Sequence, residues 1–187
     1  MAGNAAETRS RLLEAATAEF AERGIAGART DRIAAAAGCN KALIFHYFTS
    51  KDALFDVVFN AAVVEPVCNE PIDAENLAEY AGRVYDSYTA NPARARLATW
   101  YQLERADTGT LLEAITQNVQ EKATAIAEAQ KSGQVSSHLA SMDLLAVVLH
   151  MAMLWSSTGP ELEALSDKDT SHRRQVVVAA VAALLAA

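Results

Sequence analysis

Helical spacing of the apolar residues is the feature that most restricts the fold of this chain. In residues 7–23, Leu12, Ala16 and Phe20 share one stripe, and charged residues lie opposite them. Apolar runs such as 176–178 lie inside alanine-rich helical sequence, and no segment is a convincing strand. The chain has only 4 Pro and 8 Gly in 187 residues, few for an all-β protein with many turns. The sequence therefore predicts an all-α fold.

Capping residues and helix breakers divide the chain into about nine predicted helices. Gly24 suits the left-handed position that follows a helix. Thr30, Asn40 and Ser50 suit N-caps. Asn91-Pro92 combines an N-cap with a proline at the first helical position. The predicted helices span residues 7–23, 31–37, 41–48, 51–65, 73–90, 92–105, 110–132, 141–156 and 169–187.

Charge and proline content indicate two domains, residues 1–60 and 61–187. The composition shifts at 65–72, which holds two of the four prolines. The net charge is −7, from 16 Lys plus Arg and 23 Asp plus Glu. Residues 1–60 hold seven basic and seven acidic residues, so the rest of the chain carries all of the net negative charge. An acidic protein is usually a poor nucleic-acid binder, so any DNA contact is expected in the N-terminal third.

Several classes of protein and site are not expected from this sequence. The longest apolar run, 176–187, is shorter than the roughly 20 residues of a membrane-spanning helix, and the N-terminus has no apolar signal core. A cytoplasmic protein without a membrane segment is therefore predicted. Cys39 and Cys68 argue against a disulfide framework. The four histidines show no metal-ligand spacing, and neither a metal nor another cofactor is predicted.

Residues 30–51 have the spacing of a helix-turn-helix motif. Two short predicted helices are joined by Gly38-Cys39-Asn40, with glycine where the chain must turn sharply. Cys39 is expected to be a small buried residue within this turn. Small apolar residues on the first helix allow the second to pack closely. The predicted contact positions are Ile33, Ala34, Ala37, Ile44 and Phe48.

The opposite face of the second short helix carries the residues expected to read DNA. Two aromatic side chains, a histidine and a lysine exposed together are unfavourable unless something binds them. A recognition helix in the major groove has this use for them. Lys51 opposes the dipole of the helix that it begins, which becomes favourable if a phosphate binds there; the alternative is a solvated lysine beside Asp52. The predicted DNA-binding residues are Thr30, Asn40, Lys41, Ala42, Leu43, Phe45, His46, Tyr47 and Lys51.

The N-terminal pattern resembles the TetR (tetracycline-repressor-like) family of bacterial transcriptional regulators over residues 7–59. The resemblance rests on Ala15-Ala16, Phe20, Gly24, Ile33-Ala34, Ala37-Gly38, Lys41, Ile44, Tyr47-Phe48, Ser50-Lys51 and Leu54. It implies a homodimer whose N-terminal domains enter successive major grooves of a palindromic, double-stranded operator. It also implies a C-terminal domain that dimerises and binds a small effector. Phe45 departs from the tyrosine usual in the family.

The C-terminal region supplies candidates for the effector site and the dimer interface. Helix 141–156 is apolar almost all round, which predicts burial on both faces, one toward a partner and one toward a cavity. The effector is expected to be small and mainly apolar or aromatic, although each of these residues could be ordinary core and Glu104 could face solvent. The predicted effector-binding residues are Tyr85, Tyr88, Trp100, Leu103, Glu104, His150, Met151, Leu154 and Trp155. The predicted dimer residues are Val177, Val181, Leu184 and Leu185.

Three functions remain open from the sequence. The first is a repressor that an effector releases from its operator, with the helix starting at Asn91-Pro92 acting on the helix that begins at Lys51. The second is a DNA-binding regulator without a small effector, controlled by a protein partner or by its abundance. The third is a small helical enzyme using Glu104 or His150. No phosphate loop, nucleophile elbow or carboxylate pair is present, so an enzyme is not predicted.

Overall fold

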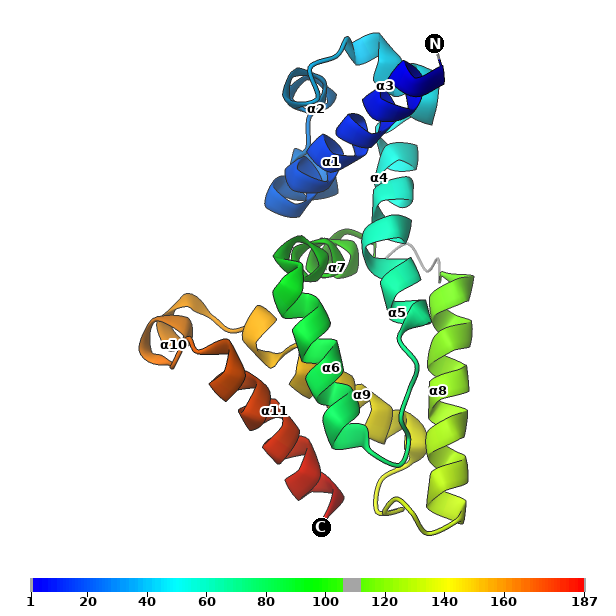
Figure 1. The fold of residues 1–187 in the computed structure, drawn as a ribbon, viewed down its shortest axis with the longest axis vertical. Helices are drawn as coiled ribbons and strands as arrows, with labels where there is room; N and C mark the ends of the chain where they lie inside the picture. Colours follow the sequence, from blue (N-terminus) through cyan, green and yellow to red (C-terminus); the bar gives the residue numbers. More distant parts are fainter. Residues whose placement is uncertain (1, 106–111, 187) are drawn as a thin grey trace. The chain divides into compact units, whose positions relative to one another are not determined.

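The protein folds into two compact helical units (Figure 1). The computed structural model describes residues 2–105 and 112–186, and no strand occurs among them. The first unit contains residues 1–67 and 93–110, and the second contains 68–92 and 111–187. The helix at 92–105 therefore packs, apart from its first residue, with the N-terminal part of the chain rather than with the C-terminal region.

The helices have the following bounds. They are α1 (Ala2–Gly27), α2 (Thr30–Ala36), α3 (Lys41–Phe48), α4 (Lys51–Phe59), a π-helical turn (Asn60–Val64), α5 (Glu65–Asn69), α6 (Leu77–Ala90), α7 (Pro92–Arg105), α8 (Glu113–Lys131), α9 (Ser141–Ala152), a 3-10 turn (Leu154–Ser156), α10 (Pro160–Leu165) and α11 (Thr170–Leu185). Over the described ranges, no helix is long and apolar enough to span a membrane.

An aromatic chain runs through the core of the first unit. Phe20 of α1 meets Phe55 of α4 edge to face, with ring centroids 5.2 Å apart. Phe55 stacks with Phe59 at 5.6 Å, and Phe59 stacks with Tyr101 of α7 at 4.4 Å. Such pairs add to the burial of apolar area, about 0.5–1.5 kcal/mol each. This chain joins α1, α4 and α7 in one core.

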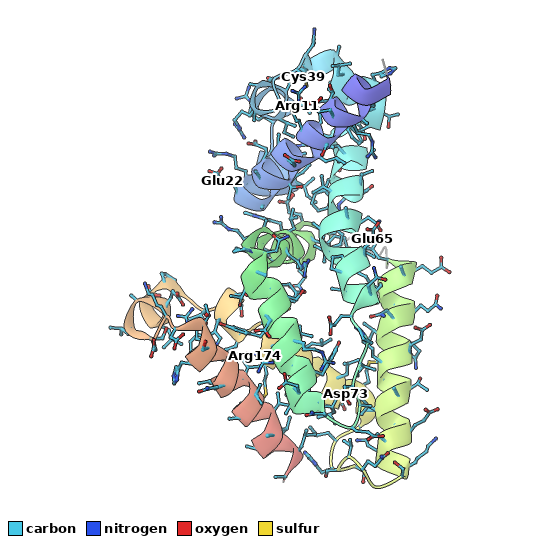
Figure 2. The ribbon with its side chains drawn as sticks, viewed as in Figure 1. Arg11, Glu22, Cys39, Glu65, Asp73 and Arg174 are labelled. Carbon is cyan, nitrogen blue, oxygen red and sulfur yellow. The ribbon has the colours of Figure 1, made fainter. Side chains whose placement is uncertain are left out.

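The second unit packs α6, α8, α9 and α11 around a largely aliphatic core (Figure 1). Helix α6 contributes the fully buried Leu77 and Tyr80, and α9 contributes Leu144 and Val148. The Arg174 side chain lies between α11 and α6, where it pairs with Glu79 and with Asp86 at 2.8 Å (Figure 2). The guanidinium lies beside Gly82, where an added Cβ would be 2.9 Å from Arg174 Nη2.

Several predicted helix bounds are wrong. The helix after Ser50 does not end before Pro66, because a π-helical turn precedes α5 and places Pro66 in the first turn of α5, where its missing N–H is tolerated. Helix α6 begins at Leu77, since the Asn76 side chain accepts from the Glu79 N–H. The interruption predicted at Gly24 is confirmed, since its φ is 71°, although helical residues extend beyond the predicted bounds, from Ala2 before it to Gly27 after it. Residues 110 and 111, where the next helix was expected to start, lie outside the described residues, and α10 was not predicted.

Candidate nucleic-acid interface

Helices α2 and α3 form the predicted helix-turn-helix. Ile33, Ala34 and Ala37 are buried, as are Ile44 and Phe48 of α3. The turn at Gly38 has φ 64°, a value that favours glycine, and Cys39 beside it is half-buried rather than buried. The Asn40 side chain accepts from the Ala42 N–H at 2.9 Å and so begins α3. The Ser50 hydroxyl accepts from the Ala53 N–H at 3.0 Å and begins α4.

Glu19 of α1 fixes the start of α2. Its carboxylate accepts from the Arg29 backbone N–H at 2.9 Å and from Arg32 Nε at 2.7 Å. The hydrogen bond from the Arg32 side chain lowers the pKa of Glu19. Arg32 Nη2 also donates to the Gly27 carbonyl at 2.8 Å. One carboxylate therefore holds the segment between α1 and α2, a role that no local sequence signal predicts.

The outward face of α3 is available for contact. Lys41, Ala42, Phe45 and His46 are exposed, and Phe45 has 46% of its surface accessible. Leu43 and Tyr47 are half-buried, and the Tyr47 ring lies edge to face with His46 at 5.3 Å. Of the remaining predicted contacts, Thr30 is half-buried at the start of α2 and Asn40 is exposed. The structure thus brings the α2–α3 candidates together on one motif.

Lys41 is paired within the motif. Its Nζ lies 2.5 Å from Asp31 Oδ1 of α2, and this hydrogen bond lowers the pKa of Asp31. Both side chains are about half-exposed, so the pair is open to solvent. Asp31 was not among the predicted site residues, although an opposite charge ten residues before Lys41, across a short turn, was a usable signal. A base or phosphate that binds Lys41 competes with this carboxylate.

Lys51 has backbone partners that the sequence did not reveal. Its Nζ donates to the carbonyl of Ile25 at 2.6 Å, to Ala28 at 3.2 Å and to Ala26 at 3.4 Å. An ammonium has three donors, and these three carbonyls match them. In this arrangement Lys51 joins the start of α4 to the end of α1, so a phosphate contact would require it to exchange partners.

The residues predicted for an effector are divided between the two units. Tyr85 and Tyr88 are buried on α6 in the second unit. Trp100, Leu103 and Glu104 belong to α7 in the first unit, where Leu103 has 69% of its surface accessible. His150, Met151 and Leu154 line an open hollow of about 470 Å³ on one side of α9, together with Ala146 and Val147. Trp155 is half-buried.

Arg173 makes the environment of Trp155 polar. Its guanidinium carbon lies 4.6 Å from the centre of the Trp155 ring, and the same side chain pairs with Glu163 of α10 at 2.8 Å. The indole Nε1 of Trp155 is buried and has no hydrogen-bond partner among the described residues. Within the same ranges, no three His, Cys, Asp or Glu side chains are grouped so that they could hold a metal ion.

Comparisons with known proteins identify the motif. The family described as "Bacterial regulatory proteins, tetR family" matches residues 12–58, and "Tetracyclin repressor-like, C-terminal domain" matches residues 76–182. The chain is 34% identical over 157 residues to the HTH-type transcriptional repressor SCO4008 of Streptomyces coelicolor, covering 83% of this chain and 81% of the relative. The chain belongs to the TetR family of bacterial transcriptional regulators.

Solved structures agree with the family. A Streptomyces coelicolor protein, SCO4942, whose crystal structure is described as that of a transcriptional regulator, has a TM-score of 0.85 at 33% identity, covering 95% of this chain and 97% of its own. Salmonella enterica GusR has a TM-score of 0.67 at 19% identity, with 96% of each chain covered, which shows the shared fold. This TetR-family protein is a DNA-binding transcriptional regulator and not an enzyme, as predicted.

Proposed function

We propose that this TetR-family protein is a cytoplasmic repressor that binds a palindromic operator as a homodimer and is released by a small, mainly apolar effector. The observation that carries the operator part is the exposed face of α3, with its lysine, histidine and phenylalanine on a motif whose inner face is buried. Repression is supported by the 34% identical relative, which is named a repressor.

Direct reading of bases is assigned to α3. Lys41 can donate to a guanine edge or a phosphate, and His46 can donate to a base acceptor. Ala42 and Phe45 are exposed apolar groups that suit a thymine methyl, and Leu43 lies beside them. Thr30, Asn40 and Tyr47 flank this face and are assigned to the phosphate backbone.

The dimer is assigned to α9 and α11, which pack on each other. Met142, Ala146 and His150 of α9 and Leu154 of the 3-10 turn after it are exposed and follow one another at four-residue spacing. Val177 and Val181, in contrast, are 1% and 0% accessible inside the protomer, so they offer no area to a partner. Leu184 and Leu185 are half-buried near the end of α11. The stripe on α9 is the stronger basis for the interface.

A variant pair tests the dimer. Ala146→Glu places a charge in the α9 stripe and is expected to give folded monomers by sedimentation at micromolar concentration, because desolvating an unpaired carboxylate is costly. Ala18→Glu makes the same change on an exposed part of α1 and should leave the dimer intact. A wild-type monomer, or an unaltered dimer in Ala146→Glu, would reject this interface.

The effector is assigned to the second unit. Tyr85 and Tyr88 supply buried aromatic surface on α6, while Met151 supplies apolar surface at the end of α9. The net negative charge of residues 61–187 disfavours a densely anionic effector. An effector that releases DNA must bind the non-operator conformation more tightly, and a preference of about 100-fold corresponds to roughly 2.7 kcal/mol.

One experiment tests the operator part of the proposal. The full-length protein selects duplexes from a random-sequence pool, and an inverted repeat is expected, with half-sites separated by about one or more helical turns. Exchanging Lys41, Ala42 and His46 should change the recovered consensus. Selections that return no consensus, or the same consensus after the exchange, would reject α3 as the reading helix.

A second titration tests the effector. Compounds that change the Trp155 fluorescence of a Trp100→Phe variant are then added to the wild-type protein bound to its selected duplex. An effector should weaken operator binding in the same concentration range. A compound that binds the second unit tightly without changing operator affinity would favour a regulator controlled by a protein partner or by abundance.

A further inference from the structure

Helix α1 is broken at Gly24, and side chains of α7 complete the broken hydrogen bonds. Gly24 has φ 71° and ψ −177°, so the helix is not continuous there. In an unbroken helix the Ile25 N–H would donate to the Ala21 carbonyl. Instead the Ile25 N–H donates to Glu104 Oε1 at 2.9 Å, and the Ala21 carbonyl accepts from Trp100 Nε1 at 3.3 Å.

The second free amide is bound by the same carboxylate. The Ala26 N–H donates to Glu104 Oε2 at 2.8 Å, so each oxygen of Glu104 holds one backbone donor. Hydrogen bonds to a charged group are stronger than neutral ones. Glu104 and Trp100, one turn apart on α7, therefore satisfy two donors and one acceptor that the break exposes.

Gly24 fits these two side chains closely. A Cβ at this position would overlap Glu104 Oε1 and lie 2.7 Å from Cε3 of Trp100. The position requires glycine for its backbone angles and for the approach of α7. Gly38 and Gly133 also have positive φ, yet a Cβ there would meet nothing within 4 Å. The close approach at Gly24 is thus not a general property of the glycine turns in this chain.

The carbonyls that follow the break are held by another side chain, Lys51. Lys51, the first residue of α4, donates to Ile25 and Ala28, while Glu104 holds the amides of the same segment. Arg105, next to Glu104, pairs with Asp52 of α4 at 2.9 Å and lies 3.8 Å from Asp56. These groups border a small hollow of about 320 Å³. Helices α1, α4 and α7 therefore meet at residues 25–28, directly before α2.

We propose that Glu104 and Trp100 are positioning residues for operator binding: they clamp the broken turn of α1 and so set the direction in which the chain enters the helix-turn-helix. The proposal rests on the operator-binding function above. Residues 25–29 lead straight into α2 at Thr30, so a change of direction at Gly24 moves α2, and α3 with it.

Glu104→Ala tests the clamp, with Gln102→Ala on the same helix as the matched control. Binding is measured to the duplex recovered from the random pool and to a scrambled duplex of the same length. Glu104→Ala should weaken operator binding by about tenfold or more, because two charged hydrogen bonds are lost. Binding to the scrambled duplex should change by less than about twofold, since the phosphate-binding charges are untouched. Hydrogen exchange of a peptide spanning residues 21–28 should become faster. Gln102→Ala should match the wild type in all three measurements.

Two milder variants extend the test if Glu104→Ala folds poorly. Glu104→Gln keeps one acceptor oxygen, and Trp100→Phe keeps the ring while removing the N–H donated to Ala21. Each should lose operator affinity by about threefold to tenfold. Operator affinity within twofold of the wild type in folded variants, or an equal loss on both duplexes, would overturn the clamp. A wild-type protein without preference for any duplex would overturn the proposed function itself, so the two failures are distinguished.

Discussion

The two units of this protein treat their interior polar groups differently. In the first unit, the break at Gly24 exposes two donors and an acceptor, and each is bound by a side chain from α7. In the second unit, Trp155 Nε1 and Asn118 Oδ1 are buried with no hydrogen-bond partner within the described ranges. Lys122 is also buried in this unit, 5% accessible, but it has interaction partners, and its ammonium lies 5.5 Å from the centre of the Tyr80 ring.

The difference in hydrogen bonding between the two units fits two kinds of task, binding DNA in one orientation and rearranging to bind another molecule. A motif that must meet DNA in one orientation benefits from fully satisfied hydrogen bonds, which specify a single arrangement. Buried polar groups that are incompletely satisfied cost free energy and mark regions that can rearrange or bind something. The hydrogen bonds that hold the first unit in one arrangement therefore come from α7 as well as from the helix-turn-helix residues themselves.

Gly24→Ala should break the first unit more severely than any other change considered. The backbone conformation is nearly exclusive to glycine, and the Cβ displaces Glu104 and Trp100, so a loss of about 3 kcal/mol or more in unfolding free energy is expected. Gly133→Ala in the second unit, with φ 76° and open space, should cost about 1–2 kcal/mol. Urea denaturation measures both. Equal losses would show that α7 adds no constraint at Gly24.

Lys51→Ala separates a backbone contact from a phosphate contact. Because Lys51 Nζ donates to carbonyls at the end of α1, the variant should lose about 1.5–3 kcal/mol of unfolding free energy. The slope of log affinity against log salt should stay as in the wild type. A slope lower by about 1, with stability unchanged, would instead restore the phosphate role predicted from the sequence.

The variant Lys122→Met tests whether burial of Lys122 makes the free energy of unfolding depend on pH. Burial lowers the pKa of Lys122 below its usual 10.5, so the unfolded chain holds the proton more tightly. Stability of the wild type should therefore rise as pH increases from the folded pKa toward 10.5. The variant should lack this rise and be more stable near neutral pH. Unfolding is followed below pH 10, and a rise of the same size in both proteins would contradict the assignment.

Tyr80 also titrates in alkaline solution, so it limits the pH range in which the effect of Lys122 can be measured. Its effect on the free energy of unfolding has the opposite sign and serves as a control. Burial raises the pKa of Tyr80 from 10.0 to about 12, so the unfolded chain loses this proton first. Stability should fall as pH rises from about 10 to about 12, the opposite sign to Lys122. Tyr80→Phe should remove this fall while leaving the rise below pH 10. A fall that persists in Tyr80→Phe would assign it to another group.

Asp31→Asn is expected to have the smallest effect. The change frees Lys41 from its carboxylate partner and removes a negative charge beside the proposed DNA surface. Affinity should rise by about twofold to fivefold on both the selected and the scrambled duplex, since the gain is electrostatic and independent of sequence. Glu22→Gln, an exposed acid on α1, is the matched control. A gain confined to the selected duplex would show that Asp31 acts on base reading.

Local signals in the sequence were sufficient for most of the helix-turn-helix. The N-cap predicted at Thr30 is wrong, because Thr30 is the first residue of α2 and Arg29 occupies the cap position without a side-chain cap hydrogen bond. Asn40 and Ser50 cap their helices through their own side chains, and Gly38 turns the chain, as predicted. Ile44 and Phe48 are buried as their spacing required. These features depend on residues a few positions apart, so the printed sequence contains the information that determines them. The all-α fold and the family followed from the same local pattern.

Tertiary packing decided the hydrogen-bond partners of Lys51 and Glu104 and the buried face of α11, which no local pattern could predict. The carbonyl partners of Lys51 are 23–26 residues away, and the amides bound by Glu104 are 78–79 residues away. Val177 and Val181 lie on an alanine-rich helix that is apolar on every side, so periodicity could not show which side faces the protomer core. Side-chain hydrogen bonds and helix orientation depend on which distant segments meet. Which segments meet is determined by the burial of whole apolar helix faces, and not by residues that are neighbours in the sequence.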